Sequence, residues 1–252
     1  MKKNIICIDI NFGKEEEYIN RITEDIKQGT GGYVCFSNVH MLIEANDNKE
    51  FAGVVNGAKY AFPDGFPIAK SFNILYHQNQ DRIAGMDFLP DYLEVCNREG
   101  FKVGFVGSTD EILKQVKDKI SKELRNVEVT ALISPPFGKP WDNDAYIEMI
   151  NKSGTDLVFV ALGCPKQEKW MHQNYEKIDA MLFGIGGALP TYVGEIKRAP
   201  QWMCDYGLEW LYRLYKEPRR MFKRYLYTNT KFSFLLIREF FRFKKHKSEA
   251  VK

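Results

Sequence analysis

Leu157-Val158-Phe159-Val160-Ala161-Leu162 is the stretch that decides the fold, because it is apolar throughout. A strand with one face in water would alternate apolar and polar residues, so an unbroken apolar run predicts a strand that is covered on both faces. Gly163 and Pro165 end the run, and a helical pattern begins at Lys166. A strand followed at once by a helix is one step of a parallel α/β sheet.

The same alternation extends in both directions along the chain. With the decisive strand placed at 156–162, further strands are expected at 4–10, 33–37, 59–62, 102–107, 127–133 and 180–185. Helices are expected at 15–28, 39–57, 87–99, 110–124, 142–152 and 166–177. We therefore predict an α/β fold, a Rossmann-like and mainly parallel sheet with helices on both faces.

The bulk composition limits the class of protein. A chain of 252 residues with 44% hydrophobic content can bury one large domain, or one domain plus an appendage, which argues against disorder. The five cysteines have no disulfide or zinc spacing and indicate a reducing compartment. Asp9 interrupts the first apolar stretch too early for a signal peptide, and no run reaches the roughly 18 apolar residues that span a bilayer. A cytoplasmic protein is expected.

The composition changes near residue 200, where aromatic and basic residues become frequent. Residues 213–252 carry thirteen Lys and Arg against three Asp and Glu, a net +10, which leaves −7 for residues 1–212 because the whole chain is +3. We therefore predict a core domain at 1–200 and a C-terminal helical appendage at 201–252, in which the basic charge is concentrated.

The appendage has the pattern of a basic amphipathic helix. At about 100° per residue, five basic residues fall within roughly 40° of one another: Arg220, Arg224, Lys231, Arg238 and Arg242. The apolar residues that cluster on the opposite side are Phe222, Tyr225, Leu226, Leu236, Phe240 and Phe243, and Leu235 lies closer to the basic residues. Such a helix suits an anionic membrane surface. The alternatives are a helix packed on its own domain and a nucleic-acid site; the acidic core and the lack of a base-recognition motif argue against nucleic acid.

The loops after the predicted strands carry the residues that suggest chemistry. They are Pro63-Asp64-Gly65, Gly104 to Ser108, Gly163 to Glu168, and Gly184 to Gly187. Ligands of open parallel sheets bind beyond the carboxyl ends of the strands, so these loops are expected to surround one cleft. Asp64 is either a catalytic carboxylate or the N-cap of a helix starting near Phe66. The glycines either present N–H groups to a diphosphate or only permit tight turns.

A metal site is not expected. Asp142-Asn143-Asp144 matches the D-x-D pattern of metal-dependent glycosyltransferases, but it opens a helix after Pro140-Trp141, so capping is the favoured role. The four histidines have no metal-ligand spacing. We predict neither a metal nor any other cofactor.

Five motifs, in order between about residues 30 and 225, resemble those of the WecG/TagA/CpsF glycosyltransferase family. The first four are Ser37-Asn38-Val39-His40, Pro63-Asp64-Gly65, Asp81 to Asp87 and Ala161 to Glu168. The fifth is a C-terminal signature made of Arg198-Ala199-Pro200, Gly207 to Leu214 and Glu217-Pro218-Arg219-Arg220. Many relatives have Thr two residues before the Asn of the first motif, where this chain has Phe36, with Ser37 adjacent.

The resemblance implies a metal-independent, inverting hexosyltransferase. It would move N-acetylmannosamine or a related hexose from a UDP-sugar to an undecaprenyl-diphosphate-linked sugar, during synthesis of a bacterial surface polysaccharide or teichoic acid. The enzyme would lie peripherally on the inner face of the plasma membrane. The alternative is a non-catalytic accessory subunit of a membrane glycosyltransferase. A homo-oligomer is also considered, because apolar surface left uncovered without the tail would self-associate.

The resemblance also assigns roles to residues. Asp64 would be the general base, with Arg82 and Gln167 as positioning or charge-stabilising groups. Donor binding is expected from Asn38, Gly104, Gly107, Lys166 and Gly186, through fixed donors that replace a metal ion at the diphosphate. The acceptor diphosphate would be bound by Arg213, Arg220 and Arg224, because guanidinium groups match phosphate oxygens in pairs.

Overall fold

The computed structural model of the chain describes residues 1–249, and the side chains of Asp205, Arg220 and residues 246–249 lie outside that description. The predicted α/β fold is confirmed. Six parallel strands are ordered β4-β3-β8-β7-β5-β6. Their bounds are β3 Gly32–Ser37, β4 Tyr60–Pro63, β5 Lys102–Gly107, β6 Glu128–Ile133, β7 Leu157–Ala161 and β8 Met181–Gly184.

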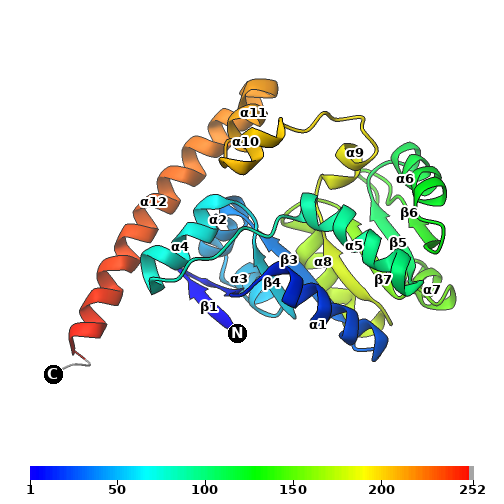
Figure 1. The fold of residues 1–252 in the computed structure, drawn as a ribbon, viewed down its shortest axis with the longest axis horizontal. Coiled ribbons are helices and arrows are strands. Elements are labelled where there is room, and N and C mark those ends of the chain that lie inside the picture. The colour runs from blue at the N-terminus through cyan, green and yellow to red at the C-terminus, as the bar shows by residue number, and fades with distance from the viewer. Residues whose placement is uncertain (250–252) are drawn as a thin grey trace.

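Helices cover both faces of this sheet, as the apolar strands required (Figure 1). One face packs against α2 Val39–Asp47, α3 Lys49–Asn56, α4 Phe66–Tyr76, α7 Asn143–Lys152 and α8 Lys166–Asn174, which a 3₁₀ turn at Tyr175–Lys177 follows. The other face packs against α1 Glu15–Lys27, α5 Gly85–Glu99, α6 Asp110–Glu123 and α9 Ala188–Tyr192. Val158 and Val160 point into the first core and Leu157 and Phe159 into the second, so β7 is buried from both sides.

Two predicted elements were wrong in their extent. The strand expected at 4–10 is an antiparallel hairpin, β1 Lys2–Ile5 and β2 Ile8–Asn11, and it forms a separate two-stranded sheet. Ile6 turns the chain at φ 63°, a conformation that β-branched residues rarely adopt. The helix expected at 39–57 is divided into α2 and α3, because the Asn48 side chain accepts a hydrogen bond from the N–H of Phe51 and starts a new helix.

The appendage consists of three helices, α10 Gln201–Asp205, α11 Glu209–Lys216 and α12 Pro218–Glu249. Figure 1 shows α10 and α11 beyond the carboxyl edge of the sheet, while α12 runs past α2 and α4 and projects from the body. Phe232 and Leu236 of α12 are buried in the same core as α2 and α4. Lys231 pairs with Asp47 at the end of α2. The long helix is therefore packed on its own domain.

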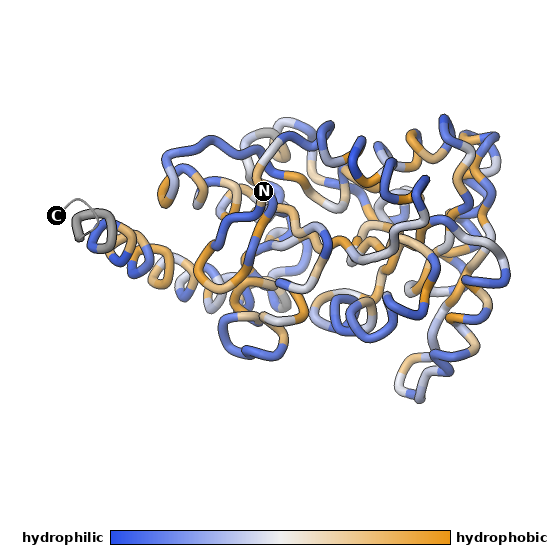
Figure 2. The backbone as a smooth tube through the Cα atoms, turned by 90° about the horizontal axis from the view of Figure 1, so that it is seen from below, coloured by the Kyte–Doolittle hydropathy of each residue, from blue (hydrophilic) through white to orange (hydrophobic). Residues whose placement is uncertain are grey.

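The apolar face predicted for α12 divides into two. Leu235, Leu236, Phe240 and Phe243 pack against the core, whereas Phe222 and Leu226 are exposed. The exposed apolar stripe of α12, a name kept below, consists of Phe222, Leu226, Phe234, Ile237 and Phe241. At about 100° per residue these five side chains lie within an arc of roughly 120°, on the side away from Phe232. Figure 2 shows hydrophobic and hydrophilic residues alternating along this projecting helix.

Among residues 1–249, no helix combines the length and the apolar character needed to cross a bilayer. All five cysteines are free thiols, as their spacing predicted.

The two faces of α12 predict opposite effects of the same substitution. Phe232 is 5% exposed and Phe234 is 66% exposed. Phe232→Ala leaves a cavity in the core and should lower the free energy of unfolding by about 3 kcal/mol. Phe234→Ala removes no buried contact and should change it by less than about 0.5 kcal/mol. Urea unfolding followed by circular dichroism measures both, and equal losses would contradict this packing of α12.

Candidate active site

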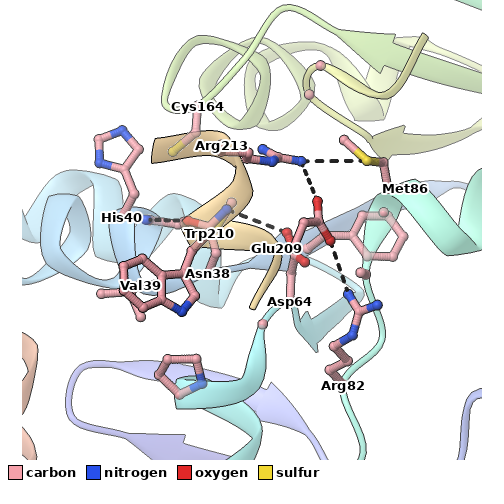
Figure 3. A pocket seen from close by; sticks show the side chains of 18 of the residues that line it. Asn38, Val39, His40, Asp64, Arg82, Met86, Cys164, Glu209, Trp210 and Arg213 are labelled. Atoms are coloured by element: carbon pink, nitrogen blue, oxygen red, sulfur yellow. Dashed lines mark hydrogen bonds and ion pairs between the residues drawn. The ribbon is translucent and has the colours of Figure 1, made fainter. Parts of the chain in front are cut away.

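A cavity of about 500 Å³ lies where the carboxyl edge of the sheet meets the appendage. The core contributes the residues after β3, β4, β7 and β8 and the segment that leads into α5. The appendage contributes Glu209, Trp210 and Arg213 from α11 and Arg224 and Tyr225 from α12. Figure 3 shows Arg213 and Glu209 close to Asp64, with Asn38 beside them. The wall of the cavity is thus built by both parts of the chain.

The cavity brings together most of the residues that the sequence singled out. Those that line it are Asn38, Asp64, Arg82, Gln167, Gly186, Arg213 and Arg224. Gly104, Gly107 and Lys166 are not among its lining residues. The side chain of Arg220 lies outside the described part of the chain.

The two glycines of β5 have a packing reason. A Cβ at Gly104 would lie 3.2 Å from Thr155 Cγ2 and 3.3 Å from Ala131 Cβ, inside the sheet. A Cβ at Gly107 would lie 2.5 Å from the carbonyl oxygen of Ala161 on the neighbouring strand. Close packing of neighbouring side chains explains Gly104, and close approach of the neighbouring backbone explains Gly107. Donor binding by Gly104, Gly107 or Lys166 stays a prediction.

Asp64 is held at the end of β4 and is not a helix cap. Its N–H donates to the carbonyl oxygen of Ser37 at 2.9 Å, which extends the register between β3 and β4 by one residue. The N-cap of α4 is Gly65, at φ 109°, and no side chain caps that helix. Because the capping alternative is wrong, the Asp64 carboxylate is available to the cavity. Asn38 Nδ2 donates to Asp64 Oδ2 at a long 3.5 Å.

The surroundings of Asp64 raise its pKa to about 6 from the ordinary 3.8. Burial is the largest cause, because it disfavours the charged carboxylate. Arg213 acts in the opposite direction, and the negative charge of Glu209 raises the pKa further. A carboxylate with a pKa near 6 is ionised at neutral pH and can still accept a proton, which suits a general base.

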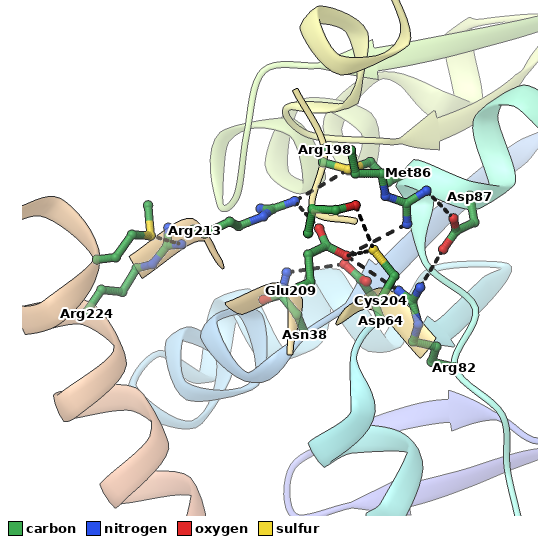
Figure 4. A network of polar contacts seen from close by, with 12 residues as sticks. Asn38, Asp64, Arg82, Met86, Asp87, Arg198, Cys204, Glu209, Arg213 and Arg224 are labelled. Atoms are coloured by element: carbon green, nitrogen blue, oxygen red, sulfur yellow. Dashed lines mark hydrogen bonds and ion pairs between the residues drawn. The ribbon is translucent and has the colours of Figure 1, made fainter. Parts of the chain in front are cut away.

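A cluster of charged groups joins the core to the appendage (Figure 4). Asp87 of α5 pairs with Arg82 at 2.9 Å and with Arg198 of the connecting segment at 2.5 Å. Glu209 of α11 accepts from Arg213 at 2.8 Å, and its carboxylate lies 3.9 Å from Arg82 and 3.8 Å from Arg198. Arg198 and Glu209 were not among the predicted site residues. Their signal was present, since both stand in the C-terminal signature and Glu209 is four residues before Arg213.

Gln167 uses its whole amide to hold two loops. Its Oε1 accepts from the N–H of Gly163 at 3.2 Å and of Gly186 at 2.9 Å. Its Nε2 donates to Gly184 O at 3.0 Å and to Glu168 Oε1 at 2.6 Å. Two donors and two acceptor directions are the full capacity of the group. The arrangement favours a positioning role for Gln167. The N–H of Gly186, which was expected to bind the donor substrate, is already hydrogen-bonded to Gln167.

Arg224 lies at the wall of the cavity without a carboxylate contact among the described residues. Its Nη2 donates to Met221 Sδ, and its Nε is buried without a hydrogen-bond partner. The pKa of His40 is lowered mainly by burial, and the positive charge of Arg224 lowers it further. An arginine in this state can bind an anionic ligand without breaking an existing ion pair.

The positions of Asp142 and Ser37 bear on two further predictions. Asp142 accepts a hydrogen bond from the N–H of Ala145 at 3.1 Å and caps α7, as favoured over metal binding. Among the side chains that the structure describes, no group of three or more His, Cys, Asp or Glu could hold a metal ion. Phe36 lines the cavity, whereas Ser37 is fully buried and is not among the lining residues. The Ser37 hydroxyl is therefore not among the groups that line the cavity.

Comparison with known proteins supplies an independent result. The model of the "Glycosyl transferase WecG/TagA/CpsF family" matches residues 3–246. The chain is 30% identical, over 219 residues, to the N-acetylglucosaminyldiphosphoundecaprenol N-acetyl-beta-D-mannosaminyltransferase of Bacillus subtilis (strain 168). The aligned part covers 86% of this chain and 83% of that relative.

The neighbours of Asp64 predict opposite shifts of its titration. Glu209→Gln removes a negative charge and should lower the pKa of Asp64 from about 6, whereas Arg213→Gln removes a positive charge and should raise it. We expect shifts of about half a pH unit in each case. Carboxyl ¹³C NMR of aspartate-labelled protein measures them. Titration of Asp64 near its ordinary value, or shifts of the same sign, would contradict this electrostatic description.

Proposed function

Because the chain belongs to the WecG/TagA/CpsF family of glycosyltransferases, we propose that it transfers a hexose from a UDP-sugar to a lipid-linked diphosphate sugar, with Asp64 as general base. The name of the relative specifies transfer of N-acetylmannosamine to N-acetylglucosaminyl-diphospho-undecaprenol. We propose substrates of the same class for this chain. The observation that supports the proposal best is the uncapped Asp64 carboxylate in a cavity that also contains arginines.

The proposed step is a single displacement with inversion. The acceptor hydroxyl oxygen attacks the anomeric carbon of the donor sugar while its proton passes to Asp64. The bond from the anomeric carbon to the diphosphate oxygen breaks on the opposite side, and the electron pair leaves with UDP. A raised pKa supports this role, because the carboxylate is ionised at neutral pH and becomes a usable acid once protonated.

The arginines from the appendage would bind the acceptor diphosphate. Arg224 carries no carboxylate contact among the described residues. Arg213 lies close to Asp64, and its Nη2 donates to Glu209 Oε1 at 2.8 Å and to Met86 Sδ at 3.5 Å. A diphosphate between them would receive paired hydrogen bonds from guanidinium groups. Arg220 remains a predicted third ligand. Fixed cationic donors also offset charge on the phosphates, which supports a metal-independent reaction.

The division at residue 200 then has a functional sense. The core would carry the base and hold the donor, while residues 201–252 would bring the acceptor and close the cavity against water. Both parts line one cavity, which supports this division of roles.

Contact with a membrane is the remaining part of the proposal. The exposed apolar stripe of α12 consists of aromatic and aliphatic side chains. Trp202 of α10, Tyr206 directly after α10 and Tyr215 of α11 are exposed as well. Basic side chains lie beside that stripe on α12, in a segment of net charge +10. Aromatic and basic residues together favour the interface of an anionic bilayer, so we place the protein peripherally on the cytoplasmic face.

Removal of the proposed base should abolish transfer. Asp64→Asn keeps the shape of the side chain but cannot accept the proton, so kcat should fall by about 10³-fold while UDP binding persists. In the unchanged protein, kcat/KM should fall as the pH drops through about 6, where Asp64 becomes protonated. A transfer assay with a lipid-diphosphate acceptor, run with and without EDTA, measures both.

The matched control is Asp142→Asn, at the cap of α7, which should keep transfer near normal. Substantial turnover by Asp64→Asn would contradict the base assignment, and loss of turnover in EDTA would contradict metal independence. An unchanged chain without turnover that stimulates a partner transferase would instead support an accessory subunit.

The exposed apolar stripe predicts the strength of membrane binding. Ile237→Ser together with Phe241→Ser should reduce cosedimentation with anionic vesicles by at least about tenfold, because each side chain loses the free energy of burial in the interface. The control is Phe137→Ser, since Phe137 is 97% exposed on the loop between β6 and α7, and Figure 1 shows both of these elements at the end of the molecule opposite α12. Equal binding by both variants would contradict the proposed membrane surface.

A further inference from the structure

A glycine of the appendage lies against Phe66, in the segment that follows Asp64. Gly207 lies between α10 and α11, and a Cβ built on it would be 2.6 Å from Cδ2 and 2.7 Å from Cγ of Phe66. Real Cβ atoms do not approach other atoms so closely. Any side chain at position 207 would therefore have to move either the ring of Phe66 or the appendage itself.

Phe66 is poorly placed to give way. It is the first residue of α4, two residues after Asp64, so a shift of its backbone would carry the catalytic segment with it. The guanidinium of Arg82 lies over its ring, 5.7 Å from the centroid, and Arg82 is itself held by Asp87 at 2.9 Å. Packing and an ion pair thus fix the ring against which Gly207 rests.

Gly207 is also tied closely to the groups that the appendage places over the base. Its N–H donates to Cys204 O at 3.1 Å, and the N–H of Leu208 donates to Met203 O at 2.7 Å, which joins α10 to the start of α11. Glu209 follows two residues later and Arg213 six residues later, in one helix. The position of Gly207 therefore sets the position of both charged groups.

We infer that the contact of Gly207 with the ring of Phe66 fixes the placement of the appendage on the core, so that Glu209 and Arg213 lie beside Asp64. Gly207 is then a positioning residue for the transfer reaction, and the cavity depends on the absence of a side chain there. This inference rests on the proposed function, in which the appendage supplies groups to the active site.

The other reason for a glycine at this position is the backbone. Gly207 has φ +73°, a conformation in which any L side chain is strained. Gly194, in the segment before α10, has φ +86° but has nothing within 4 Å of its Cβ position. Alanine at 194 therefore introduces a similar backbone strain without the contact. A comparison of the two alanine variants separates the contact from the conformation.

The experiment compares Gly207→Ala, Gly194→Ala, Phe66→Ala and the double variant Gly207→Ala with Phe66→Ala, all in the full chain. Amide hydrogen exchange of residues 201–216 reports placement of the appendage, independently of activity. Gly207→Ala should accelerate this exchange by about tenfold and Gly194→Ala by less than about twofold. In the double variant the truncated Phe66 leaves room for the new methyl group, so the exchange should return toward that of Phe66→Ala.

Transfer is measured on the same proteins. Gly207→Ala should lower kcat by at least about tenfold with UDP binding retained, because misplaced groups weaken the reaction rather than donor binding. The double variant should recover part of that loss. Unchanged exchange in Gly207→Ala, or no recovery in the double variant, would overturn the inference. Accelerated exchange with normal transfer would show that the contact positions the appendage, but it would overturn the role of Gly207 in transfer and the proposed role of the appendage in the active site.

Discussion

Burial of the sheet on both faces is the constraint on which the rest of the structure depends. Two separate apolar cores, one on each side of β7 and β8, leave no room for polar chemistry within the sheet. The functional groups of the core therefore lie beyond the carboxyl edge of the sheet, where Asp64, Gln167 and Gly186 are found. The long projecting α12 is anchored to one of these two cores, because Phe232 and Leu236 are buried in it.

The sequence could predict the sheet because its strands are continuous apolar runs. In a chain that alternates such runs with helical patterns, each run is expected to form a strand buried on both faces. The sequence could not predict local interruptions. The hairpin at 4–10 depends on a left-handed turn at Ile6, for which no glycine or proline gave a signal. The division of the helix at 39–57 depends on one hydrogen bond, which the Asn48 side chain accepts from the N–H of Phe51. Angular periodicity likewise found two sides of α12 but not which apolar side chains the core would cover.

For the candidate site, the motifs predicted which residues come together but not what each one contacts. Asp64 was ambiguous between catalysis and capping until the backbone placed the cap at Gly65. Gln167 was expected near substrate, yet its hydrogen bonds are all used within the two loops that it joins. Gly104 was expected to bind the donor, and its close packing within the sheet is a second reason for a glycine that the motif did not reveal. Hydrogen-bond satisfaction and close packing are properties of the assembled structure, so no linear pattern records them.

The balance of charge around Asp64 explains why the appendage brings both signs of charge to the cavity. Arginines alone would hold the Asp64 carboxylate firmly ionised and make it a weak base. Glu209 opposes Arg213, and Asp87 pairs with both Arg82 and Arg198. The three carboxylates then match the three arginines of this cluster when Asp64 is ionised. Arg224 stands outside that balance, so the uncompensated positive charge lies at the wall of the cavity, where an anionic ligand can meet it without lowering the basicity of Asp64.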